Sequence, residues 1–90
     1  MIRVLVIEDS PTCLNLMVNL METDPEIKIV GQATSGRQGV EMAGQLKPDL
    51  ITMDVVMEDM DGLEATKNIM AENPIPIIIV TAFTEYNGLN

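Results

Sequence analysis

The sequence predicts a doubly wound α/β fold built on a parallel β-sheet. Two observations predict it: short segments rich in β-branched apolar residues recur along the chain, and a helix-forming segment separates each from the next. The short segments are apolar along their length, as in strands that are covered on both faces. Crossovers between parallel strands are right-handed and place helices on both sides of the sheet.

Seven elements are expected, in the order β-α-β-α-β-α-β. Their ranges are a strand at 2–7, a helix at 11–22, a strand at 27–33, a helix at 35–47, a strand within 47–54, a helix at 61–73 and a strand within 74–81. Asp9 or Ser10 can cap the first helix, whose first turn suits Pro11. Asp61 is expected to cap the third helix rather than bind a metal, and Asp59 lies in the loop before it.

A chain of 90 residues is expected to form one domain, because single domains commonly contain about 100–150 residues. Its apolar runs, such as 77–80, are far shorter than the roughly 20 residues of a membrane-spanning helix. The N-terminus, "MIRVLVIEDS", lacks the basic flank and small-residue cleavage site of a secretory signal. A cytoplasmic location is therefore expected.

The balance of charge is strongly acidic, with 14 Asp and Glu residues, five Lys and Arg residues and a formal charge of -9. Nucleic-acid phosphates would be repelled, so direct binding to nucleic acid is not expected. Acidic faces commonly serve only solubility, but clustered carboxylates can also hold a divalent cation. Cys13 is the only cysteine, which excludes an internal disulfide and a thiolate metal cluster. It is expected to be a small apolar residue of the first helix.

Polar side chains end three of the predicted strands. Glu8 and Asp9 follow the first strand, Asp54 ends the third and Thr81 ends the fourth. In doubly wound sheets, ligands bind beyond the carboxyl ends of the strands. If these three strands are neighbours, the four side chains share one crevice.

The chemistry of this crevice favours a magnesium ion over a nucleotide cofactor. The loop after the first strand lacks the glycines that bring backbone amides to a phosphate, which argues against FMN or NAD. Its carboxylates suit Mg²⁺, which binds through one or two carboxylates, keeps water ligands and accepts a phosphate oxygen. Asp54 can then attack phosphorus to form an aspartyl phosphate, and Thr81 can donate its hydroxyl to the phosphoryl oxygens.

Each of these residues also has a purely structural interpretation. Asp9 can serve only as a helix cap, Asp54 as the start of a loop and Thr81 as a β-branched strand residue. Glu8 can point into solvent, and it is expected to be a weaker metal ligand than Asp9. The placement of all four at strand ends favours a shared function.

The segments "VLVIEDSP", "DLITMDVVMEDMDGLEA" and "IPIIIVTA" resemble the receiver domain of bacterial two-component response regulators. The resemblance covers essentially the whole chain. The segments "TDPEIKIVGQA", "MDGLEA" and "IMAENPIPIIIVTA" look most like the receiver of the chemotaxis protein-glutamate methylesterase family. This resemblance implies a flavodoxin-like sheet of order 2-1-3-4, with residues 1–90 forming a receiver domain that is incomplete at its C-terminus.

The resemblance also implies a function and a site. Asp54 would be the phosphoacceptor for a sensor histidine kinase or a phosphotransfer protein of a two-component phosphorelay. Thr81 would be the switch residue that is drawn toward the phosphoryl group, and Ala82 the small neighbour that leaves the phosphate accessible. The implied Mg²⁺ ligands are Glu8, Asp9, Asp54 and the backbone carbonyl of Val56.

Three features depart from the family pattern. Glu8 stands where Asp is commoner, and Glu58 stands where the loop after the acceptor usually has a proline. The family continues through another helix, a fifth strand with a lysine that contacts the phosphoryl group, and a last helix, whereas this chain stops at "TEYNGLN". Without that lysine, the alternative function is a truncated receiver that acts as a non-switching binding or dimerisation module.

The chain is not expected to be an enzyme with a separate substrate. The methylesterase domain of the related family is absent, so the only reactions expected are phosphorylation and dephosphorylation of the chain itself. A metal-dependent phosphohydrolase would need a second acid two residues beyond the nucleophile. This sequence has Val56 at that position, so such an activity is not expected.

The fourth strand and the first helix predict a partner. Without a fifth strand, the apolar fourth strand becomes a sheet edge with no charge to discourage pairing. The first helix, "PTCLNLMVNLM", is apolar nearly all round, which indicates either deep burial or an interface for a kinase or phosphotransfer protein. Burial together with self-association is favoured, so a homodimer or an element-swapped oligomer is expected.

Overall fold

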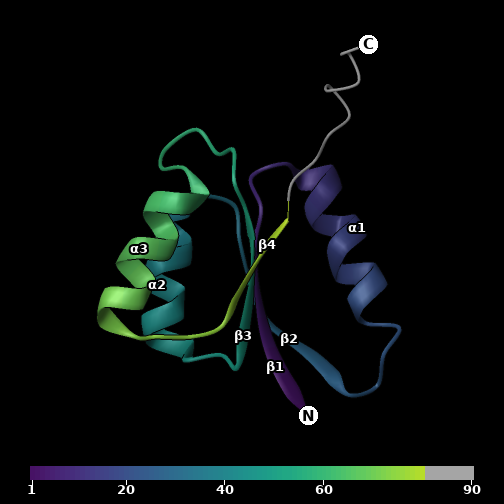
Figure 1. Ribbon diagram of the computed structural model, residues 1–90. Helices are drawn as coiled ribbons and strands as arrows, with labels where there is room; N and C mark the ends of the chain where they lie inside the picture. Colours follow the sequence, from purple (N-terminus) through teal and green to yellow (C-terminus); the bar gives the residue numbers. More distant parts are fainter. Residues whose placement is uncertain (81–90) are drawn as a thin grey trace.

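The computed structural model describes residues 1–80 of the chain and contains the seven elements expected, in the expected order (Figure 1). Within these residues, no helix is long and apolar enough to span a membrane. The elements are β1 (Ile2–Ile7), α1 (Pro11–Met21), β2 (Ile27–Ala33), α2 (Gly36–Leu46), β3 (Leu50–Asp54), α3 (Gly62–Glu72) and β4 (Ile77–Val80).

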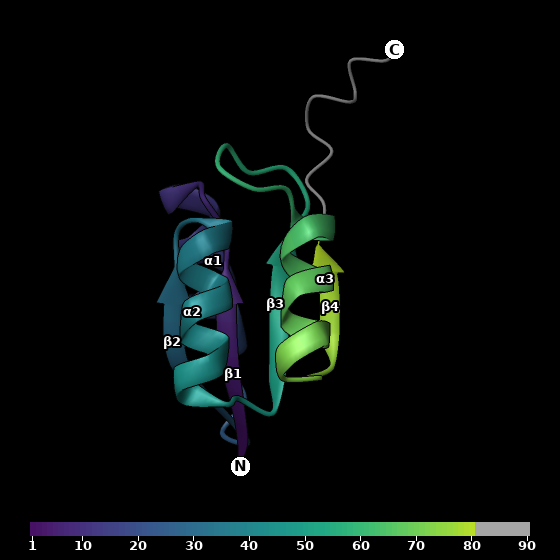
Figure 2. The same ribbon diagram turned by 90° about the vertical axis from the view of Figure 1, so that its left-hand side faces the viewer.

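The four strands form one parallel sheet in the order β2-β1-β3-β4. All four point the same way, so their carboxyl ends meet at one edge, next to the loop between β3 and α3 (Figure 2). The predicted flavodoxin-like order 2-1-3-4 is therefore confirmed for the described strands. The order places β1 and β3, the strands that precede the candidate acids, side by side.

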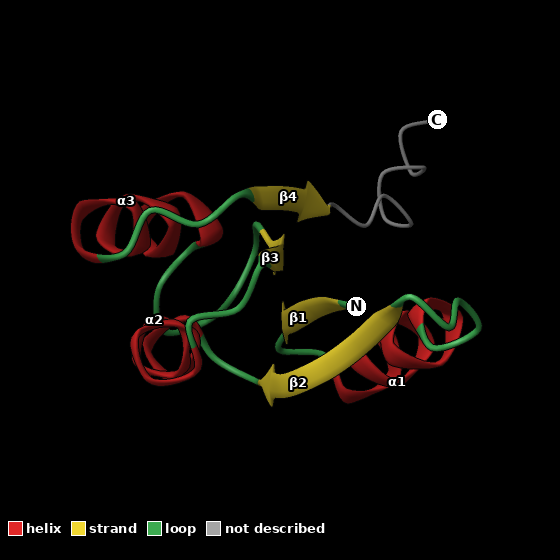
Figure 3. Cartoon of the chain, turned by 90° about the horizontal axis from the view of Figure 1, so that it is seen from below, coloured by secondary structure: helices red, strands yellow, loops and turns green. Residues whose placement is uncertain are grey.

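The sheet separates two hydrophobic cores (Figure 3). On one face, α2 and α3 cover the larger core; on the other, α1 covers the smaller one beside β1 and β2. The larger core consists of Leu5, Ile7, Ala33, Ala43, Ile51, Met53, Met57, Ala65, Ile69 and Ile75. The buried residues of the smaller core are Val4, Val6, Leu14 and Val18. Alternate residues of β1 and β3 thus supply opposite faces, as the period of two in a strand requires.

Side-chain caps set the beginnings of α1 and α3. The Ser10 hydroxyl accepts a hydrogen bond from the Cys13 amide at 3.3 Å, so Ser10 rather than Asp9 caps α1. The Asp61 carboxylate accepts one from the Glu64 amide at 2.8 Å, as predicted. Because Asp9 is not the cap, its carboxylate remains free for another role.

The last turn of α2 is fixed by a side chain from β1. The guanidinium of Arg3 donates hydrogen bonds to the carbonyls of Leu46 and Lys47, both at 2.9 Å. These carbonyls have no partner inside the helix, and a cation is favoured at this end of the helix dipole. The Arg3 amide also donates to the Asp49 carboxylate at 2.9 Å. Arg3 therefore ties the start of β1 to the end of α2 and the start of β3.

A single copy of the chain does not bury α1 deeply, which corrects the burial part of the prediction for this helix. Leu14 and Val18 face the core, but Leu16 and Leu20 are 64% and 69% exposed. An 11-residue helix on one face of a sheet can bury only one stripe, so its other apolar residues meet solvent. On β4, Ile78 is 52% exposed, so this strand is not covered on both faces by the described residues.

Candidate functional site

The acidic side chains at the carboxyl edge of the sheet come from two adjacent strands. Asp54 is the last residue of β3, and Glu8 and Asp9 follow directly after β1. Because Ile7 pairs with Met53 in the parallel register, the next residues of both strands emerge at the same level. The topology alone therefore brings the three carboxyl groups into one neighbourhood.

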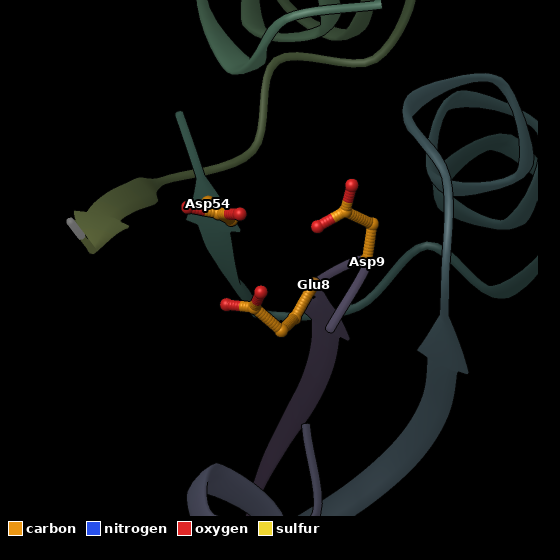
Figure 4. A group of neighbouring side chains, drawn as sticks. All are labelled: Glu8, Asp9 and Asp54. Atoms are coloured by element: carbon orange, nitrogen blue, oxygen red, sulfur yellow. The ribbon is translucent and has the colours of Figure 1, made fainter. Parts of the chain in front are cut away.

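The three carboxyl groups converge on one point (Figure 4). One carboxylate oxygen from each of Glu8, Asp9 and Asp54 lies within 4.8 Å of the other two. Of the four side chains predicted to share a crevice, these three do come together. Thr81 and Ala82 lie outside the described residues, so their predicted places at the site stay predictions.

Two of the three acids are removed from solvent. Glu8 is only 8% exposed and Asp54 only 9%, which excludes the alternative in which Glu8 points into solvent. The Glu8 amide donates to the Ala33 carbonyl at 2.9 Å, and the Glu8 carboxylate accepts a hydrogen bond from the Ser10 amide at 3.2 Å. These contacts hold the longer Glu8 side chain inside the crevice.

Burial changes the acidity of Glu8. Desolvation disfavours its charged form and raises the pKa of the Glu8 carboxyl above its ordinary value. The hydrogen bond from the Ser10 amide opposes this rise, and the negative charge of Asp54 adds to it. The site therefore holds a carboxylate whose negative charge is only partly compensated by the protein.

The donor set fits a magnesium ion. Mg²⁺ prefers oxygen ligands, binds through one or a few carboxylates and retains water molecules. Glu8, Asp9 and Asp54 offer carboxylate oxygens at a common point. Asp9 is only half-buried, which leaves a path for water and for a phosphate group. A bound cation would also neutralise the carboxylates that repel one another here.

This uncompensated charge leads to a prediction for the metal-free chain. Because the folded-state pKa of Glu8 is raised, the stability that this group contributes is present at low pH and is lost as the pH rises through the raised pKa. Glu8→Gln is therefore expected to raise the thermal midpoint at pH 7 by a few degrees. In a domain of this size, a gain of about 1 kcal/mol in the free energy of unfolding raises the midpoint by roughly 4–8 °C.

Calorimetry or circular dichroism in the presence of a chelator measures this difference. The difference between the variant and the wild type should shrink as the pH falls below the ordinary pKa of a glutamate, because protonation removes the charge of Glu8 in both the folded and the unfolded state. Added Mg²⁺ should then stabilise the wild type more than the variant, because binding to the folded state is linked to its stability. A variant that melts below the wild type at pH 7 would contradict the prediction.

The loop between β3 and α3, residues 55–61, is closed by Gly62. The Gly62 amide donates to the Val55 carbonyl at 2.7 Å. A Cβ atom on Gly62 would collide with the Asp54 carbonyl oxygen and would lie 2.8 Å from the Cα of Val55. Only a residue without a side chain fits so close to the backbone of the strand end. Gly62 therefore fixes where Asp54 leaves the strand.

The tip of the same loop is attached to α2 through Asp59. Its two carboxylate oxygens accept hydrogen bonds from the Gly36 and Arg37 amides, both at 2.9 Å. Hydrogen bonds from the backbone amides of Arg37 and Gly36 lower the pKa of Asp59 below its ordinary value. This contact was not predicted from the sequence. It joins residues 23 positions apart, and no motif or periodicity near either residue indicates it.

A polar cavity lies next to the acidic cluster. Its volume is about 270 Å³, and its lining residues are Asp9, Thr34, Ser35, Glu58 and Asp59. The loops after β1, β2 and β3 all contribute to this wall. The cluster therefore opens on one side into a hollow that carries negative charge.

Comparison with known proteins gives one consistent family. The family model described as "Response regulator receiver domain" matches residues 4–89. A protein-glutamate methylesterase/protein-glutamine glutaminase of Anaeromyxobacter dehalogenans is 52% identical over 82 residues, which cover 91% of this chain and 24% of that protein. One from Myxococcus xanthus is 48% identical over 84 residues, covering 93% of this chain and 24% of that protein.

A solved structure agrees with these relatives. The response regulator domain of Thermotoga maritima CheB superposes with a TM-score of 0.89 at 42% identity, covering 93% of this chain and 63% of that one. The chain thus spans about a quarter of the length of the curated relatives it matches. The predicted resemblance to the receivers of chemotaxis methylesterases is confirmed by both kinds of comparison.

Proposed function

Since the chain belongs to the response regulator receiver domain family, we propose that it accepts a phosphoryl group on Asp54 from a histidine kinase or phosphotransfer protein, with Mg²⁺ bound. The observation that carries this proposal is the convergence of Glu8, Asp9 and Asp54, whose oxygens lie within 4.8 Å of one another. Asp54 is the acid that a strand end presents to this point, which suits a nucleophile that must be held still.

The proposed reaction is a transfer from nitrogen to oxygen. A carboxylate oxygen of Asp54 attacks the phosphorus atom of a phosphohistidine, and the P–O bond forms as the P–N bond breaks. The electron pair of the P–N bond leaves with the imidazole, which takes up a proton and departs neutral. Removal of water around Asp54, which is 9% exposed, makes its carboxylate a less solvated nucleophile.

The other acids are proposed to hold the metal. Glu8, Asp9 and Asp54 supply carboxylate oxygens, and the backbone carbonyl of Val56 in the following loop is the proposed fourth protein ligand. Bound Mg²⁺ would neutralise the charge that develops on the phosphoryl oxygens. Thr81 is proposed as the hydroxyl donor to those oxygens, and the small side chain of Ala82 would leave them accessible.

The proposal is tested by incubating the chain with Mg²⁺ and a small phosphoryl donor such as acetyl phosphate. Intact mass spectrometry should show one added phosphoryl group that is lost in alkali and with hydroxylamine, as that of an acyl phosphate is. A chelator should prevent the modification. An unmodified chain that nevertheless binds Mg²⁺ would overturn the phosphoacceptor proposal and leave the binding-module alternative in its place.

No ester-cleaving step is proposed for this chain, although its curated relatives are named for such an activity. The match covers only 24% of each of those proteins. The sequence contains no histidine, so the serine–histidine arrangement that many esterases use cannot form within it. The acidic cluster, in turn, argues against a module that only binds partners.

We also propose that the chain associates with a second copy. The exposed apolar residues of α1 and β4 support this proposal: Leu16, Leu20, Ile78 and Ile79 are each at least 40% exposed. Exposed strand edges and apolar patches favour association. Sedimentation at micromolar concentration should show a dimer, and replacing Ile78 with Lys should shift the chain toward monomer. A wild type that sediments only as a monomer would overturn the proposal.

A further inference from the structure

The loop of residues 55–61 has no secondary structure, yet it is attached at several points. Its stem is closed by Gly62, and Met57 is buried in the larger core. Its tip contacts the first turn of α2 through Asp59. The Val56 side chain between these points is 78% exposed, so packing does not hold this residue directly. Its position depends on the attachments to either side.

The contact between Asp59 and α2 is specific in its geometry. The first amides of a helix have no partner within it. Asp59 satisfies the Gly36 and Arg37 amides, and the Ser35 hydroxyl accepts from the Gln38 amide at 3.1 Å. Two charge-assisted hydrogen bonds to one carboxylate fix both its distance and its orientation.

A second observation shows how closely the loop lies on α2. A Cβ atom on Gly36 would lie 2.8 Å from the Met60 carbonyl oxygen and 2.9 Å from the Met60 Cβ. The missing side chain is thus what lets the loop backbone rest on the first turn of the helix. Asp59 and Gly36 both support the contact between the loop and the first turn of α2. Asp59 does so by hydrogen bonding, and Gly36 does so by leaving space for the loop backbone.

We propose that Asp59 is a positioning residue for the metal site: by binding the first turn of α2, it holds the loop so that the Val56 carbonyl can reach the ion. This inference rests on the proposed function, since it assumes that Mg²⁺ binds among Glu8, Asp9 and Asp54. Groups that orient ligands without touching the ion commonly change metal affinity about 10- to 100-fold when they are removed.

The test compares three variants by calorimetric titration with Mg²⁺ at a temperature where each is folded. Asp59→Asn removes a charge and one of the two acceptor oxygens that bind the Gly36 and Arg37 amides, and it should weaken binding about tenfold. Gly36→Ala keeps every charge but pushes the loop off the helix, so it should weaken binding to a similar extent. Glu58→Gln removes a charge from the same cavity wall but no described hydrogen bond, and it should weaken binding only about twofold.

Salt separates positioning from simple electrostatics. In about 0.5 M salt, the effect of Glu58→Gln should disappear, whereas those of Asp59→Asn and Gly36→Ala should persist. Amide hydrogen exchange should show faster exchange of Gly36 and Arg37 in Asp59→Asn, but not in Glu58→Gln. If Asp59 contributed only its charge, the effect of Asp59→Asn on Mg²⁺ binding would disappear in high salt, and the exchange of the Gly36 and Arg37 amides would not change.

Two outcomes distinguish the inference from the proposal beneath it. If the wild type binds no Mg²⁺ at millimolar concentration, the proposed function fails. If the wild type binds Mg²⁺ but Asp59→Asn and Glu58→Gln weaken it equally at all salt concentrations, the positioning role of Asp59 is overturned while the metal site stands.

Discussion

Asp54→Asn is expected to abolish phosphorylation of the chain completely. The amide oxygen of asparagine carries no full negative charge and does not displace the nitrogen of a phosphohistidine or the carboxylate of acetyl phosphate. The same substitution also removes one of the carboxylates that meet within 4.8 Å, so the loss should exceed that of any other single change. Intact mass after incubation with Mg²⁺ and acetyl phosphate measures it.

Asp49→Asn is the matched control for this prediction. Asp49 precedes the same strand, β3, at the opposite end of the sheet, where it accepts a hydrogen bond from the Arg3 amide. Its variant should still take up one phosphoryl group. Borohydride reduction of the modified wild type should convert Asp54 to homoserine, which peptide mapping locates. Undiminished phosphorylation of Asp54→Asn would mean that another residue is the acceptor.

Gly62→Ala is expected to lower the free energy of unfolding by about 2–3 kcal/mol. The new methyl group would meet the Asp54 carbonyl and the Val55 Cα, which are backbone atoms and cannot rotate away. The strand end would therefore have to move, and phosphorylation of Asp54 should slow as well. Urea denaturation and the rate of phosphoryl uptake measure the two effects.

Gly44→Ala supplies the contrast, because it makes the same change in another helix. A Cβ atom there would lie 3.6 Å from the Asn73 side-chain nitrogen, an ordinary contact. Alanine in a helix interior is about 0.5–1 kcal/mol more favourable than glycine. This variant should therefore be more stable than the wild type. If both variants had the same free energy of unfolding, the close approach of Gly62 to the strand end would not contribute to stability.

The convergence of the acids could be predicted because it depends only on topology. Parallel strands place their carboxyl ends at one edge, so Glu8, Asp9 and Asp54 had to be near one another once β1 and β3 were neighbours. The burial of Glu8 could not be predicted in this way. It is accompanied by a local hydrogen bond from the Ser10 amide and by one to the Ala33 carbonyl, and the second forms only when the ends of β1 and β2 pack together.

Irregularities of the strands and loops also escaped prediction. In the pairing of β1 with β2, Val4 is opposite Ile29 and Leu5 is opposite Gly31, so Val30 is skipped in a bulge. The alternation of residue types in "IKIVGQA" does not mark this shift. The attachment of Asp59 to α2 likewise joins segments that no periodicity connects.

The exposure of apolar residues was the least predictable feature. The composition of α1 was compatible with burial or with an interface, and the structure buries Leu14 and Val18 while exposing Leu16 and Leu20. Sequence shows how apolar a helix is, but the number of its neighbours decides how many sides are covered. The predicted place of Thr81 remains a prediction, since this residue lies outside the described part of the chain.

The α2 helix is tethered at both ends by side chains from distant parts of the chain. The anionic Asp59 binds the amino end of α2, and the cationic Arg3 binds its carboxyl end. Each charge is favourable there, because the helix dipole is positive at the amino end and negative at the carboxyl end. The helix cannot shift along its axis without breaking the charge-assisted hydrogen bonds made by Asp59 or Arg3. Within residues 1–80, no such pair of anchors holds α1 or β4. Movement of α2 relative to β1 and to the loop of residues 55–61 would therefore require these hydrogen bonds to break first.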